Sequence, residues 1–257
     1  MNQEPILHVG EFLPQKPVLA VEYPLPGEGI PVEIRKSLHP WLGQFVGLDA
    51  IKAHSLVREW WADIQEDFLY PLRDYLLGFV PRSIIRLPDD HAWLVLADPR
   101  FDSAKMASLE GEVGNAWFFL TSPNQVFLNQ RLTAFDLDGI TGLRTFVSKF
   151  GCLSECAPYG AGGFSLPVWW HNLETLFPDF SESGNYGFWK SAVVFFAAAD
   201  GSKLLLHPSG KTGWWEMEEN VVYEFCNDFP AFIEVYTKFI PKRYSFSWMV
   251  EGVPSAK

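Results

Sequence analysis

The chain has 257 residues and a formal net charge of -11, and 48% of its residues are hydrophobic. This composition predicts a folded globular protein and excludes an intrinsically disordered chain. The charge argues against a nucleic-acid-binding role, because a protein this acidic repels a phosphate backbone.

Three features of the sequence predict a soluble protein of the cytoplasm, without membrane association. The three cysteines are too few, and odd in number, for a disulfide framework, which indicates a reducing compartment. The N-terminal stretch "MNQEPILHVGEFLPQKP" has neither the basic nor the long apolar region of a signal peptide. The longest wholly apolar run, residues 192–199, is far shorter than a membrane span.

The N-terminal part predicts extended segments followed by helix. Residues 1–48 are proline-rich and weakly periodic, so we expect loops and one edge strand at residues 18–23. Residues 50–77 repeat apolar side chains at helical spacing, which predicts an amphipathic helix. Pro71 is expected to kink or end this helix near Tyr70, and a second short helix should follow.

The middle of the chain predicts two hairpins and a helix. Residues 83–98 read as two strands around a turn at residues 88–90, and residues 115–130 read as a hairpin turning at residues 122–125. Residues 136–151 carry one apolar stripe at helical spacing. In this helix we expect Asp138 to cap the start and Gly151 to provide the left-handed stop.

The C-terminal part predicts an antiparallel meander closed by a helix. Four short strands are expected at residues 192–198, 203–207, 212–217 and 221–225. The closing helix should begin at its N-cap Asp228, hold Pro230 in its first turn and end at Pro241.

Helices segregated from an antiparallel, in part mixed, sheet define an α+β fold. Residues 131–257 would form its main domain. The sequence leaves open whether residues 1–130, the helix-plus-hairpins region, fold separately or as part of the same domain.

The residues that could support catalysis or metal binding do not form a recognisable site. Cys152, Cys156 and His171 fall short of the four ligands that a closed zinc site requires. The glycine-rich residues 160–163 are not followed by the Lys-Ser/Thr of a phosphate loop, so they indicate a turn with close backbone approach. We therefore expect no catalytic residue, no metal and no cofactor. The alternative is an enzyme or small-molecule binder with Cys152, His171 and His207 in a cleft between the two halves.

The last hundred residues carry a recognisable order of motifs. A "GGF" segment is followed by "SAVVFFAAADGSKLLL" and then by "GKTGWWEMEENVVYEFCNDFPAFIEVY". Over about residues 137–242 this order resembles the SUKH superfamily, which includes a yeast regulator of cell-wall glucan synthesis and many bacterial toxin-immunity proteins. The turn at Asp200-Gly201, the strand from Gly210 to Trp215 and the helix start at residues 228–233 carry the resemblance. The first 130 residues exceed the usual core of that superfamily.

The resemblance implies a non-catalytic immunity protein that neutralises a cognate toxin by direct binding. Such toxins belong to type VI secretion and other polymorphic toxin systems, and a nuclease or another secreted effector is the expected partner. An acidic protein is suited to a nuclease toxin, whose phosphate-binding site is basic. The alternative is a regulatory or scaffold protein of the same fold that binds another protein.

Two stretches combine carboxylates with aromatic rings, which is the mixture expected at a protein interface. Residues 212–237 contain six acidic residues and no Lys or Arg. The candidate contact residues are Trp214, Trp215, Glu216, Glu218 and Glu219 in this stretch, and Asp179, Glu182 and Trp189 in residues 177–189. Because side chains alternate along a strand, Trp214 and Trp215 should point to opposite faces of the sheet.

Overall fold

The computed structural model describes residues 6–9, 18–26, 30–86, 92–98, 100, 116–120, 125–156, 163–165, 170–182, 184–197, 203–216 and 219–240. The expected turns at residues 88–90 and 200–201, the glycines at 160–162 and the helix stop at Pro241 lie outside these ranges.

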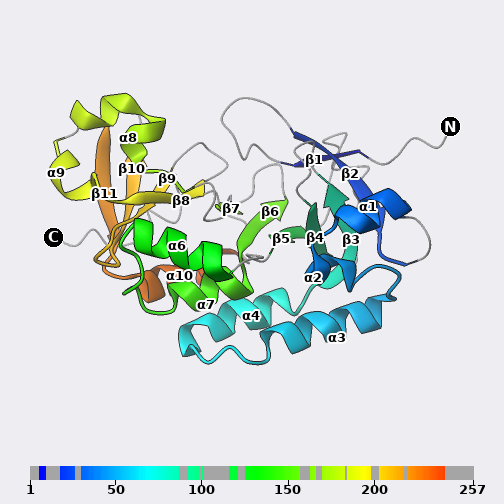
Figure 1. The fold of residues 1–257 in the computed structure, drawn as a ribbon. Coiled ribbons are helices and arrows are strands. Elements are labelled where there is room, and N and C mark those ends of the chain that lie inside the picture. Colours follow the sequence, from blue (N-terminus) through cyan, green and yellow to red (C-terminus); the bar gives the residue numbers. More distant parts are fainter. Residues whose placement is uncertain are drawn as a thin grey trace.

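The described strands form one antiparallel sheet in which the spatial order equals the chain order (Figure 1). The strands are β1 (Ile6–Val9), β2 (Val18–Pro24), β3 (Val80–Arg86), β4 (Ala92–Ala97), β5 (Ala116–Leu120), β6 (Cys152–Cys156), β7 (Gly163–Phe164), β8 (Val193–Ala197), β9 (Lys203–Leu206), β10 (Thr212–Glu216) and β11 (Val221–Cys226). Short β7 links the two parts of the sheet, with Gly163 opposite Ser154 on β6. A Cβ at Gly163 would lie 2.6 Å from the Ser154 side chain, so this close approach requires glycine. The sequence predicted a close backbone approach here, but it assigned Gly163 to a turn, whereas this residue lies in a strand.

Helices lie on both sides of this sheet, which confirms the predicted α+β class. The helical segments are α1 (Val32–Ser37), α2 (Pro40–Gly43), α3 (Ala50–Trp61), η1 (Asp67–Leu69), α4 (Tyr70–Leu76), α6 (Gln125–Ala134), α7 (Leu143–Lys149), α8 (Leu173–Leu176), η3 (Pro178–Glu182), α9 (Tyr186–Trp189) and α10 (Phe229–Phe239). In Figure 1, α3 and α4 run along the lower side of the molecule, whereas α8 and α9 lie at the upper left beside β10 and β11.

The buried side chains of the described ranges form two hydrophobic clusters. The larger one contains buried side chains from both halves of the chain, including Leu94 of β4, Phe146 of α7 and Phe232 of α10. The smaller one, which we call the satellite core, contains Leu173, Phe180, Trp189, Ala192, Val194, Leu205, Trp215 and Val222. Neighbouring residues of β8 divide between the two clusters, since Val193 belongs to the first and Val194 to the second.

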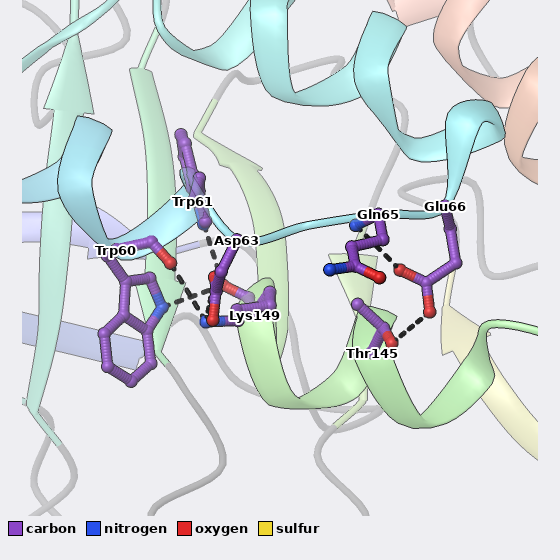
Figure 2. A network of polar contacts seen from close by, with 7 residues as sticks. All are labelled: Trp60, Trp61, Asp63, Gln65, Glu66, Thr145 and Lys149. Atoms are coloured by element: carbon purple, nitrogen blue, oxygen red, sulfur yellow. Dashed lines mark hydrogen bonds and ion pairs between the residues drawn. The ribbon is translucent and has the colours of Figure 1, made fainter.

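A polar network joins the end of α3 to α7 (Figure 2). The Lys149 ammonium lies 2.6 Å from the Asp63 carboxylate and donates to the Trp60 carbonyl at 3.1 Å. The carbonyl of Lys149, at the end of α7, accepts the indole N–H groups of Trp60 and Trp61 at 3.4 and 2.9 Å. One turn earlier, the Thr145 hydroxyl donates to Glu66. The network therefore satisfies a terminal helix carbonyl while tying residues of the two halves together.

The predicted boundary between residues 130 and 131 falls within α6. Across this position, α10 contacts both η1 and α4, and the larger core cluster includes residues from each side. The chain therefore packs its N-terminal and C-terminal parts around shared apolar surface.

Three predictions for the first half were wrong. The strand at residues 18–23 exists, but it is not an edge strand, because β2 pairs with both β1 and β3. Residues 32–43 hold two short helices rather than loops. The helix predicted to reach Tyr70 already ends at Trp61, and Pro71 lies in the first turn of α4, where a missing N–H has no cost.

Two predictions for the middle of the chain were also wrong. The second half of the expected hairpin at residues 115–130 is helix α6. Helix α7 begins after Gly142, and Asp138 caps nothing; its carboxylate instead accepts from Thr133 at 2.5 Å and from Arg144 at 2.9 Å. The predicted stop at Gly151 is confirmed by its positive φ of 55°.

The C-terminal meander and its closing helix are confirmed. Strands β8 to β11 match the predicted ranges to within one residue at each end. Asp228 is the N-cap of α10, where its carboxylate accepts from the Ala231 N–H at 2.8 Å. The apolar face of α10 is fully buried, with Phe229, Phe232, Ile233 and Tyr236 each at 0% exposure.

Candidate protein-binding surface

The two adjacent tryptophans of β10 point to opposite faces of the sheet, as predicted. Trp214 is half-buried and packs against the larger core cluster. Trp215 is 4% exposed and belongs to the satellite core. Trp214 is therefore the one member of this pair that reaches the surface.

Trp215 and Trp189 hold the short helices on the sheet. The Trp215 ring packs on Phe177 with ring centroids 4.3 Å apart. Trp189 is 3% exposed, and its ring lies so close to Gly213 that it leaves no room for a Cβ there. Two candidate contact residues thus serve the satellite core, and a partner would not reach their rings without displacing α8, η3 and α9.

A group of aromatic and acidic side chains that are exposed or half-buried lies at the end of the β10–β11 hairpin. It consists of Trp214, Glu216, Glu219 and Tyr223, and we call it the β10–β11 corner. Trp214 and Tyr223 are opposite each other in the register, with ring centroids 5.9 Å apart and planes 33° apart. Tyr223 is 44% exposed, and its hydroxyl donates to the Glu219 carboxylate.

The carboxylates of this corner influence the tyrosine. The hydrogen bond to Glu219 raises the pKa of Tyr223, and the negative charges of Glu219 and Glu216 raise it further. Glu219 therefore contacts the phenol oxygen, and Glu216 lies on the same face of β10 as Trp214. By contrast, Glu224 points to the other face, where both of its oxygens lie 2.8 Å from the Lys211 ammonium.

The remaining predicted contact residues are less closely grouped. Asp179 is exposed, and its backbone carbonyl accepts from Asn220 at 2.8 Å, which links η3 to the turn between β10 and β11. Asn220 has a positive φ of 51°, a conformation that asparagine tolerates in turns. Glu218 and the side chain of Glu182 lie outside the described residues.

Asn185 pairs with β11, the last of the described strands. Its side-chain amide donates to the Val222 carbonyl and accepts from the Val222 N–H at 3.3 Å. The side-chain amide thus takes the place of one residue of a neighbouring strand. It satisfies the N–H and C=O groups of Val222, which an edge strand would otherwise expose. Sequence reasoning missed Asn185 because a single asparagine in a loop has no pattern, and it missed Tyr223 because the register opposite Trp214 was not assigned.

Replacing Asn185 with alanine is expected to speed hydrogen exchange of the Val222 amide by about fivefold, since the loss of one hydrogen bond is worth about 1 kcal/mol. Exchange measured by NMR tests this expectation. Gly184→Ala serves as the control, because Gly184 is exposed and a Cβ there meets nothing within 4 Å. An unchanged Val222 exchange rate in Asn185→Ala would contradict the assignment of this pairing.

The residues considered for catalysis have separate surroundings. The buried Cys152 thiol donates to the Phe164 carbonyl at 2.7 Å. His171 is exposed, whereas His207 stacks on Phe188 with ring centroids 4.1 Å apart. Burial lowers the pKa of His207, and burial raises the pKa of the Cys226 thiol to about 11, which disfavours the reactive thiolate.

Two hollows on the described surface do not bring these groups together. One, of about 370 Å³, is lined by residues 44–59 of the N-terminal part, and the other, of about 180 Å³, lies between residues 139–141, the turn at 208–210 and the start of α10. Neither hollow is lined by Cys152, His171 or His207. In the part of the chain that the structure describes, there is no group of three or more His, Cys, Asp or Glu side chains placed to hold a metal ion.

The helices of the described ranges are too short or too polar to cross a bilayer. Comparison with protein-family models, with curated proteins and with solved structures finds no match to this chain.

Proposed function

We propose that this chain is a non-catalytic, protein-binding immunity protein that acts in the cytoplasm and neutralises a basic toxin by direct contact. The observation that carries the proposal is the β10–β11 corner. There, a 44% exposed tyrosine and a half-buried tryptophan lie beside two carboxylates. The sequence around the corner, residues 212–237, contains no Lys or Arg.

The physical properties of the corner suit recognition of a cationic protein. Aromatic rings provide contact area at a small cost in side-chain entropy, and they are frequent among the residues that dominate binding energy. Carboxylates at the rim increase the association rate with a basic partner. The resemblance of residues 137–242 to the SUKH superfamily supports a toxin as the class of partner.

Reversing the charge of the corner with Glu216→Lys and Glu219→Lys is expected to weaken toxin binding at least about tenfold, because like charges are then brought together at the interface. The test is co-expression with the product of the adjacent upstream gene, scored as rescue of growth if that product is toxic, together with calorimetry on the purified pair. Glu33→Lys with Glu59→Lys is the matched control, since both residues are exposed, lie on α1 and α3, and change the net charge equally.

Loss of rescue in the corner variant alone would support the proposal. Equal rescue by both double variants, with each variant folded by circular dichroism, would place the interface elsewhere. Failure of the unmodified chain to bind any neighbouring toxin would favour the regulatory or scaffold alternative.

A further inference from the structure

We propose that the β10–β11 corner receives an arginine side chain of the partner, with the guanidinium stacked on Tyr223 and hydrogen-bonded to Glu219 and Glu216. This inference rests on the proposed function and specifies the chemistry that the surface recognises. It follows from the rings, the carboxylates and their positions relative to one another.

The rings supply the stacking surface. With their centroids 5.9 Å apart and planes 33° apart, Trp214 and Tyr223 lie side by side rather than enclosing a slot. Trp214 packs inward on the core, whereas Tyr223 keeps 44% of its surface exposed. A planar cation can therefore lie on the outer face of Tyr223, where the ring quadrupole attracts it.

The carboxylates supply acceptors at the edge of that surface. Glu219 is fixed by the hydrogen bond from the Tyr223 hydroxyl, which uses one of about four lone-pair sites of a carboxylate. Glu216 is two residues beyond Trp214 on β10, so strand alternation places it on the same face. The effect of both negative charges on Tyr223 agrees with this convergence.

The geometry favours arginine over lysine. A guanidinium is planar, stacks on an aromatic face and presents a fork of N–H donors to carboxylates, and it is less strongly hydrated than an ammonium group. A lysine could satisfy one carboxylate but would not stack. The nearby Lys211 of this chain lies on the other face, where it is bound to Glu224.

The probe is a set of three short peptides, identical except for a central arginine, lysine or citrulline, titrated into the full chain. Citrulline keeps the planar shape but removes the charge. NMR would follow the Trp214 indole N–H and the Tyr223 ring. We expect the arginine peptide to shift both signals, with binding about tenfold weaker for lysine and no binding for citrulline. Glu219→Gln should weaken arginine-peptide binding about tenfold, whereas Glu33→Gln should leave it unchanged.

Equal shifts from the arginine and citrulline peptides, or equal affinity for arginine and lysine, would overturn this inference. The outcome of the peptide titration can be distinguished from the outcome of the toxin-rescue test. If charge reversal abolishes toxin rescue but the arginine peptide does not bind, the surface is an interface without an arginine site. If the peptide binds but rescue is insensitive to charge reversal, the arginine site exists and the proposed function is wrong.

Discussion

Gly142→Ala is expected to lower the free energy of unfolding by about 2–4 kcal/mol, because it combines backbone strain with a steric clash. Gly142 has a φ of +69°, which alanine adopts at a cost. A Cβ at this position would lie 2.3 Å from Cζ of Phe68, whose ring packs edge-on to Phe229 of the core at 6.4 Å. The Gly142 carbonyl also accepts from Phe146 N–H, so a shift of this residue would disturb the first turn of α7.

Urea unfolding followed by tryptophan fluorescence would measure the loss. Gly139→Ala provides the matched control, because Gly139 lies in the same loop and an added Cβ meets nothing within 4 Å. We expect that control to change the midpoint little. A Gly142→Ala chain with the stability of the unmodified protein would show that Phe68 moves aside freely and that the left-handed backbone is not needed here.

Gly213→Ala is expected to cost about 3 kcal/mol through overpacking of the satellite core. The new Cβ would lie 2.6 Å from Cγ1 of Val222 and 2.7 Å from Cη2 of Trp189. Both neighbours are buried, with exposures of 2% and 3%, so neither can relax into solvent. Displacing Trp189 would also loosen α9 and the adjoining Asn185, and exchange of the Val222 amide should accelerate together with the loss of stability.

The control for this substitution is Gly187→Ala, which lies on α9 itself and adds a Cβ that meets nothing within 4 Å. This control should retain both the stability and the slow Val222 exchange. If Gly213→Ala lowered stability without affecting Val222 exchange, the packing of Trp189 and the pairing of Asn185 would be independent of each other.

The sequence predicted the C-terminal meander well because local signals determine it. Short apolar runs separated by turn residues give β8 to β11, and Asp228 followed by Pro230 marks the start of α10. The alternation that separates Trp214 from Trp215 is a property of any extended strand, so it also needed no tertiary information.

The elements that were predicted wrongly depend on distant partners. The run at residues 125–130 is too short for periodicity to distinguish strand from helix, and its packing against the rest of the chain decides for α6. From the sequence alone, Pro71 could mark the end of one helix or the start of the next. The structure shows that it lies in the first turn of α4, directly after η1.

The candidate surface could be predicted only in part, for the same reason. The sequence located the acidic and aromatic stretch, but burial separated Trp214 from Trp215 and Trp189. Trp215 and Trp189 are buried by the segment that contains α8 and α9. These helices have four residues each, and so short a helix has no apolar period to recognise. The exposed Tyr223 emerged only when the register placed it opposite Trp214.

The agreement between strand order and chain order has a consequence for synthesis on the ribosome. Each strand emerges after the neighbour with which it pairs, so the nascent sheet grows by successive addition and its temporary open side is always the newest strand. Asn185 precedes β11 in the chain, and the residue that pairs with this last described strand has therefore already been synthesised when translation delivers it.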